Sequence, residues 1–188
     1  MQEVNDLELM ARFQRGDEEA FAELIRRHQQ SILNLICRYI GDAAEAEDLA
    51  QEAFLKVYRA RLSWQPTARF STWLHRIVVN MCLNEIRDRK RMTVGTPPEE
   101  IVAGDEREGV VATELRRELQ DAVKRAVASL PEHQRMAVLL VKYEGLSYDD
   151  ASETMGVSVE AFKSLLFRAR ESLKQNLREY VEGEEAAP

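Results

Sequence analysis

Apolar side chains recur every three or four residues along most of this 188-residue chain, a spacing that predicts helices. In the first half, Gly16, Gly41 and Pro66 interrupt the pattern. These interruptions divide the first half into four expected helices, over residues 6–14, 17–37, 44–62 and 70–91. Because the helices are amphipathic, we expect them to pack into one compact helical domain.

The second half shows the same periodicity, broken at Pro131, Gly145 and Gly156. It predicts two helices, over residues 114–130 and 132–144, then a short helix between Ser147 and Gly156, then a long helix over residues 159–180. A short helix, a glycine-containing turn and a longer helix are typical of a helix-turn-helix. A plain helical hairpin is the alternative.

Small polar residues precede several of these helices. A side-chain oxygen at such a position accepts a hydrogen bond from a free backbone N–H, so these residues predict N-caps: Asp17, Ser71, Ser147 and Ser158. Ala151 is small where the two helices of the helix-turn-helix must approach closely.

Residues 92–112 differ in character from the segments around them. They contain Pro97-Pro98, three glycines and an acidic excess, which predicts a flexible linker. We therefore expect an all-α protein of two small helical domains, residues 1–91 and 113–188. The acidity of the linker has two interpretations: an anionic strand that occupies a groove meant for nucleic acid, or charge that keeps the linker off the basic helix.

The net charge of −7 is unevenly distributed. Residues 1–55 carry −7, residues 56–91 carry +7, and the two remaining segments are mildly acidic. The distribution of charge matters more than the total for attracting a polyanion. A basic block beside an acidic one indicates two different partners for the first domain.

The basic block has a chemically uniform helix face. Steps of three or four residues place cations and amides on it, with no carboxylate among them: Thr72, Arg76, Asn80, Asn84, Arg87 and Arg91. Cations at a helix C-terminus also suit the macrodipole, so a structural role is the alternative. Nucleic acid explains more of the pattern, since such side chains reach phosphates and base edges. The nearby rings of Trp64, Phe70 and Trp73 are candidates for stacking on unpaired bases.

The final long helix has an outer face of a similar kind. In a helix-turn-helix, the second helix places N-terminal side chains on base edges and flanking cations on phosphates. The candidates on this helix are Ser158, Glu160, Lys163, Ser164, Phe167, Arg168, Arg170 and Lys174.

Other classes of function find little support. Cys37 and Cys82 each lie in an apolar helical pattern, which favours buried free thiols. No apolar run approaches the roughly 20 residues of a membrane helix, and the first residues lack signal-peptide features, so we expect a cytoplasmic protein without membrane insertion. The three histidines are scattered, and we interpret His75 as a surface residue of its helix. We expect neither catalysis, nor a metal, nor a cofactor.

Three groups of residues, in order along the chain, resemble the extracytoplasmic-function (ECF) sigma factors, the small members of the bacterial sigma-70 family. Residues 48–54 (DLAQEAF) resemble the core-polymerase-binding motif of that family. Residues 70–74 (FSTWL), with Ile77 and Asn80, resemble its promoter-melting region. The C-terminal helix-turn-helix is matched by Leu130-Pro131, Arg135, residues 145–148 (GLSY) and residues 167–170 (FRAR).

The resemblance implies a role for each group. Contacts with core RNA polymerase, on the β′ clamp helices and on β, would be made by Asp48, Gln51, Glu52, Phe54 and Lys56. The loop over residues 65–69, with Gln65 and Arg69, would capture a flipped base of the minus-ten element together with Arg76, Asn80 and Asn84. The second domain would read the minus-thirty-five element as duplex, with Arg135, Ser147 and Tyr148 joining the outer face of the final helix. Members of the family are usually held inactive by an anti-sigma factor, so we expect such a partner too.

The chain departs from the family pattern in the recognition helix. Leu165 stands where a phosphate-contacting cation is common, and Glu160 is either a reader of a cytosine amine or an acid that suits the helix start. The chief rival hypothesis is a two-domain repressor or activator that binds duplex DNA directly. The aromatic and basic region of the first domain argues against this rival, because it fits unpaired strands better than a sensor.

Overall fold

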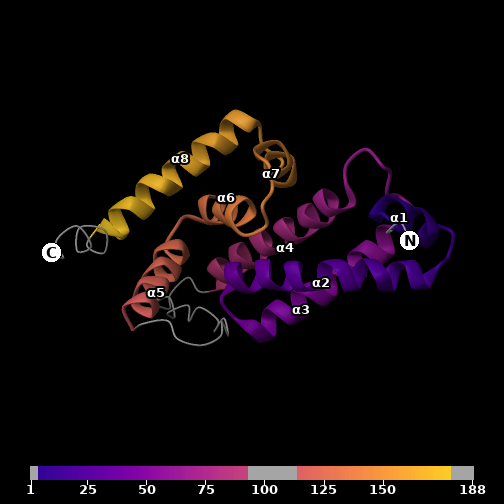
Figure 1. Cartoon of the computed structure of the whole chain (residues 1–188), viewed down its shortest axis with the longest axis horizontal. Coiled ribbons are helices and arrows are strands. Elements are labelled where there is room, and N and C mark those ends of the chain that lie inside the picture. Colours follow the sequence, from indigo (N-terminus) through magenta and orange to yellow (C-terminus); the bar gives the residue numbers. More distant parts are fainter. Residues whose placement is uncertain (1–3, 93–113, 179–188) are drawn as a thin grey trace.

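The structure, a computed structural model, describes residues 4–92 and 114–178. In those residues the chain forms helices and no strand, which confirms the predicted all-α class. The elements along the chain are α1 (Asp6–Gln14), α2 (Glu18–Ile40), α3 (Ala43–Ala60), α4 (Phe70–Met92), α5 (Glu114–Ala128), α6 (Glu132–Lys142), α7 (Tyr148–Met155) and α8 (Val159–Asn176) (Figure 1). All but the first residue of the expected linker, residues 92–112, lies outside the described residues.

Three of the four predicted N-caps are confirmed. Asp17 accepts a hydrogen bond from the N–H of Ala20, Ser147 from that of Asp150, and Ser158 from that of Ala161. The prediction for Ser71 is wrong, because α4 begins one residue earlier and places Ser71 in its first turn. Local sequence thus determines where most of these helices begin.

The apolar faces of α1 to α4 build the core of the N-terminal half. Fully buried side chains from α1, α2, α3 and α4 include Phe13, Leu24, Val57 and Leu74. Helix α2 runs three residues beyond its predicted end, to Ile40. It stops at Gly41, whose φ of 86° lies in the left-handed region that glycine adopts without strain.

The C-terminal half contains the predicted helix-turn-helix. Helices α7 and α8 pack on each other and on α6, and Gly156, with φ of 67°, forms the turn between them. Phe162, Leu166 and Ala169 form the buried face of α8. Ala151 is completely buried, as expected for a small residue at a close helix approach.

The two halves share one continuous hydrophobic core. Helix α4 lies between the α2–α3 pair and the α6–α7 pair, and it contacts α7 and α6 directly (Figure 1). Helix α2 also contacts α6. Cys82 of α4 is fully buried, as predicted, and burial raises the pKa of its thiol to about 12. Cys37 is only half-buried, and neither Cys37 nor Cys82 forms a disulfide.

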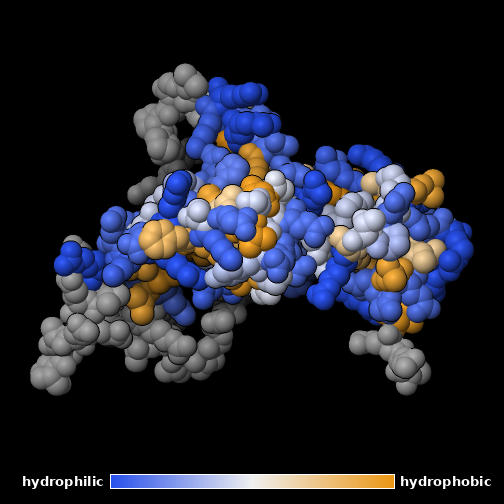
Figure 2. Space-filling model, turned by 90° about the horizontal axis from the view of Figure 1, so that it is seen from above, coloured by the Kyte–Doolittle hydropathy of each residue, from blue (hydrophilic) through white to orange (hydrophobic). Residues whose placement is uncertain are grey.

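The face of the molecule in Figure 2 is largely hydrophilic, and its apolar side chains form patches separated by polar ones. Among the described residues, none of the helices combines the length and the apolar character needed to cross a bilayer.

Candidate nucleic-acid interface and docking groove

A polar-basic stripe on α4 is open to solvent, and we define it as Arg76, Asn80, Asn84, Arg87 and Arg91. The guanidinium of Arg87 donates to Oδ1 of Asn84 over 2.8 Å. This hydrogen bond fixes the amide oxygen and leaves the amide N–H groups available as donors.

Thr72, which the sequence placed on the same face, is 3% exposed. The expectation of six exposed residues was therefore wrong at the first position. Thr72 is buried because α4 is covered on more than one side, by α2 and α3 and by α6 and α7.

The loop before α4 is anchored by a residue that the sequence did not single out. Gln14, the last residue of α1, donates from Nε2 to the carbonyl oxygens of Arg61 and Trp64, over 2.8 and 2.9 Å. Gln65 and Arg69 then project into solvent. Gln14 therefore positions the candidate loop, and no local sequence signal reveals a partner about fifty residues away.

The aromatic residues around this loop contradict a sequence-based expectation. Trp64 is only 6% exposed and Phe70 only 3%, so neither ring is available for stacking on a base in this conformation. Trp73 is half-buried and lies between them, with ring centroids 6.3 Å from Trp64 and 6.0 Å from Phe70. Trp64 and Phe70 therefore form the floor beneath the loop, and Trp73 keeps some exposed surface.

Two further residues are buried where the sequence suggested exposure. Arg135, a candidate for DNA contact, is 4% exposed, and its guanidinium lies 4.6 Å from the ring centroid of Tyr39 on α2. His75, interpreted as a surface residue, is also buried, with Nδ1 2.7 Å from the carbonyl oxygen of Ser71. Both lie where the second half of the chain packs on the first, a contact that periodicity does not reveal.

The recognition helix α8 presents its predicted outer face to solvent. Phe167 is 65% exposed, and the other exposed candidates are Ser158, Glu160, Lys163, Ser164, Arg168, Arg170 and Lys174. Tyr148, at the start of α7, is half-buried and accepts a hydrogen bond from Arg170 over 3.1 Å. Ser147 is exposed beside it. The structure therefore brings residues from both helices of the motif together on one side.

The two departures from the family pattern have local explanations. Hydrogen bonds from a backbone N–H and from Ser158 lower the pKa of the Glu160 carboxyl. These contacts favour a role for Glu160 at the helix start over a role in reading a base. Leu165 is half-buried and packs against the core. The chain therefore uses this position for packing and not for a phosphate contact.

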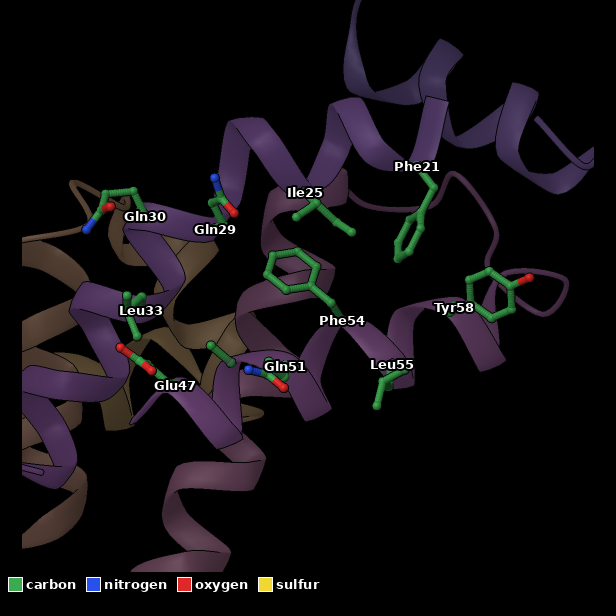
Figure 3. A pocket seen from close by; sticks show the side chains of 11 residues that line it. Phe21, Ile25, Gln29, Gln30, Leu33, Glu47, Gln51, Phe54, Leu55 and Tyr58 are labelled. Carbon is green, nitrogen blue, oxygen red and sulfur yellow. The ribbon is translucent and has the colours of Figure 1, made fainter. Parts of the chain in front are cut away.

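A groove of about 650 Å³ runs between α2 and α3 (Figure 3). Phe21 and Ile25 of α2 and Phe54 of α3 point into its apolar end, and Leu55 and Tyr58 line its edge. Its other end is more polar, with Gln29, Gln30, Glu47 and Gln51 near Leu33. Because Phe54 is 8% exposed, it shapes the floor of the groove.

Of the candidates for polymerase contact, Gln51 and Phe54 line this groove, and Asp48, Glu52 and Lys56 lie elsewhere on α3. Asp48, Gln51 and Lys56 are exposed, and Glu52 is half-exposed and forms an ion pair with Arg59 over 3.4 Å. The sequence did not reveal the groove, because Phe21 and Ile25 have the same helical spacing as the core residues of α2. The one local signal was Leu55, an apolar residue on the charged side of the helix.

Across the described ranges, no group of three or more His, Cys, Asp or Glu side chains is placed to hold a metal ion. The candidate surfaces described above consist of cations, amides, rings and an apolar groove.

Comparison with known proteins decides the family. Sigma-70 region 2 matches residues 24–92, and Sigma-70, region 4 matches residues 120–173. RNA polymerase sigma-H factor of Pseudomonas aeruginosa is 38% identical over 185 residues, which cover 92% of this chain and 94% of that protein. The chain belongs to the ECF sigma factors of the sigma-70 family.

Further comparisons agree with this assignment. ECF RNA polymerase sigma-E factor of Escherichia coli K12 is 34% identical over 188 residues, which cover 96% of this chain and 98% of that protein. The solved structure of the sigma factor RpoE in complex with the anti-sigma factor NepR from Bartonella quintana has a TM-score of 0.70 at 24% identity, and the match covers 84% of this chain and 96% of that one. The predicted family is confirmed, and the solved structure shares the fold. Sigma factors are transcription-initiation factors, and this chain is homologous to alternative sigma factors.

We predict that the buried rings of Trp64 and Phe70 stabilise the fold and that the polar-basic stripe on α4 does not. Trp64→Ala and Phe70→Ala should each lower the free energy of unfolding by about 3–5 kcal/mol, since each leaves a cavity in the core. Arg76→Ala and Asn80→Ala, at exposed positions, should change it by less than about 0.5 kcal/mol. Urea denaturation followed by circular dichroism measures all four. A Trp64→Ala protein of unchanged stability would show that this ring is not part of the core.

Proposed function

We propose that this sigma factor binds core RNA polymerase, directs it to specific promoters and assists strand opening. The observation that carries the proposal is the pairing of two open surfaces on one chain. One is the polar-basic stripe beside a loop held by Gln14, and the other is the exposed face of α8. The first suits unpaired bases and phosphates, and the second suits the major groove of duplex DNA.

In this proposal, residues 1–91 act on the minus-ten element, residues 113–188 read the minus-thirty-five element, and residues 92–112 link the two. The stripe has to offset the loss of base stacking, about 1.4 kcal/mol for each step that opens. With Trp64 and Phe70 buried, cations and amides supply most of that interaction, and Trp73 is the nearby ring with surface left for a base.

The groove between α2 and α3 is the proposed site for the β′ clamp helices of core polymerase, with β as a further contact. A groove with an apolar end and a polar end accepts the apolar face of an amphipathic helix. Glu47 and Gln51, which line the groove, then provide polar contacts, and Asp48, Glu52 and Lys56 are further polar groups on α3.

An anti-sigma factor is the proposed regulator. A fold-related sigma factor has been solved with the anti-sigma factor NepR, and the present chain offers the same kind of helical framework. An inhibitor that covers the docking groove would compete with polymerase for one surface.

Transcription from a promoter with defined minus-ten and minus-thirty-five elements tests the proposal. Core polymerase with this sigma factor should yield a specific transcript, and core polymerase alone should yield none. Equal output from the two reactions would reject the proposed function. Specific binding of this chain to duplex DNA without any effect on polymerase would support the rival hypothesis of a repressor or activator.

The stripe should act in strand opening and not in docking. Arg76→Ala and Asn80→Ala should reduce the permanganate reactivity of thymines in the minus-ten element, because each variant removes a contact to the opened strand. Both should bind core polymerase as tightly as the wild type in a fluorescence-anisotropy titration. Loss of polymerase binding in these variants would place the docking surface on α4.

The groove should act in docking. Leu55→Glu places a charge at its apolar edge and should weaken binding to core polymerase about tenfold or more, because the carboxylate loses water on docking. Leu119→Glu, the same change at another exposed leucine on α5, is the matched control and should bind normally. Equal affinities for the two variants would show that polymerase binds elsewhere.

A further inference from the structure

The tip of the loop between α3 and α4 is exposed at Gln65, Pro66 and Thr67. The N–H of Thr67 donates to the carbonyl oxygen of Gln65 over 2.8 Å, a hydrogen bond that shapes the tip but does not connect it to a helix. A loop that captures a single base needs a defined geometry, because disorder in the free site adds an entropy cost to binding. The geometry of this loop therefore depends on how its two ends are held.

The first end of the loop is held by the last residue of α1. Helix α3 ends just before Arg61, and the carbonyl oxygens at the end of a helix need donors from outside it. Gln14 supplies them, because its Nε2 donates to the carbonyl oxygens of Arg61 and Trp64 over 2.8 and 2.9 Å. An amide has two N–H groups, so both are used here. Gln14 therefore fixes the backbone from Arg61 to Trp64.

The other end of the loop is held through α2. Phe70 is the first residue of α4, and the ring of His28 on α2 meets it edge to face, with centroids 5.3 Å apart. Nε2 of His28 lies 2.7 Å from Oδ2 of Asp6, the first residue of α1. The other carboxylate oxygen of Asp6 accepts a hydrogen bond from Arg27 over 3.1 Å. Asp6 therefore sets the orientation of the imidazole against Phe70.

Helix α1 thus connects to both ends of the loop, and we define Asp6, Gln14 and His28 as the loop brace. Asp6 and Gln14 are the first and last residues of α1, about 12 Å apart along its axis. The helix is held against α2 and α4 by its own apolar face, on which Met10 and Phe13 are fully buried. A packed helix of this kind keeps a constant distance between the two points that it holds.

A purely structural role is the alternative for these contacts. Gln14 would then only satisfy the end of α3, and its loss would lower stability without a particular effect on an opened strand. The placement of the contacts favours the loop. The two buried rings that form its floor, Trp64 and Phe70, are each attached to the loop brace, one through its carbonyl oxygen and the other through its ring.

We propose that Asp6, Gln14 and His28 are positioning residues for strand opening, which hold the floor of the loop at the spacing that an extruded base requires. This role deepens the proposed function and rests on it, because it requires that the loop captures a base. The loop brace acts through Trp64 and Phe70, without contact between its own side chains and DNA. Its effect is therefore confined to the step in which a base enters the loop.

Removal of single bases identifies the captured nucleotide. Holoenzyme formed from core polymerase and the full-length chain is bound to fork-junction DNA, in which one abasic site is moved along the single-stranded minus-ten element. With the wild type, an abasic site at the captured position should lower the affinity about fivefold or more, which is the contribution of one stacked base. Equal affinity at every position would reject the strand-opening part of the proposed function.

Gln14→Glu then tests the loop brace, because it keeps the size of the side chain and replaces the donating amide by an acceptor. The variant should bind the intact fork about fivefold more weakly than the wild type, and the abasic site should cost it little more, because the loop no longer holds the base. Gln14→Lys, which restores a donor, should recover much of the dependence on the base. Gln120→Glu, the same change at an exposed glutamine of α5, is the matched control and should behave as the wild type.

His28→Leu tests the other end of the loop brace. It removes the contact with Asp6 and should reduce the dependence on the base in the same way, whereas His133→Leu, at an exposed histidine of α6, should not. A lower folded fraction weakens the apparent binding of intact and abasic forks alike, so the ratio of the two affinities reports positioning and not stability. A wild-type ratio in Gln14→Glu and His28→Leu would overturn the loop brace and leave the proposed function intact.

Discussion

Other helices pack against α4 on more than one side. The rest of the structure depends on how the circumference of α4 is divided between buried and exposed residues. Consecutive residues of a helix are separated by about 100° around the helix axis. Seen down the axis of α4, the buried residues therefore occupy an arc of roughly 160°, with Leu74 at one edge and Thr72 at the other. An amphipathic helix on the surface of a single core needs an apolar stripe of about 100°. The extra arc is covered because α6 and α7 pack on α4 in addition to α2 and α3.

The exposed stripe covers only about 80° of the remaining arc of α4, and this concentrates its chemistry. Arg76, Asn80 and Asn84 share one line of side chains beside the loop, on the segment of the chain with the largest positive charge. Trp64 and Phe70 are used beneath the loop, where they hold the backbone in place. A site built on a rigid helix with buried rings for support needs little reorganisation when a nucleotide arrives, and this lowers the entropy cost of binding.

The sequence predicted what local interactions determine and failed where the two halves meet. Ser147 and Ser158 were predictable caps, because their partners lie three residues away. Arg135 was expected at the surface, as arginine usually is, yet Tyr39 covers it from 96 positions earlier in the chain. The groove was missed for a related reason: periodicity identifies an apolar face, but it does not show whether a neighbouring helix covers that face completely. The predicted roles of the individual contact residues remain predictions.

The composition of the recognition helix suits a DNA-binding domain that depends on a larger assembly. Phosphate contacts supply much of the affinity for duplex DNA, and each one that is lost reduces both the affinity and its dependence on salt. Leu165 packs inward at a position where a cation would reach a phosphate, and Glu160 is engaged at the helix start. What remains exposed is a small set led by Lys163, Phe167 and Arg168, in which the ring suits contact with a thymine methyl group. Such a face discriminates between sequences better than it grips DNA, so stable promoter binding has to draw on contacts made by the first half and by polymerase.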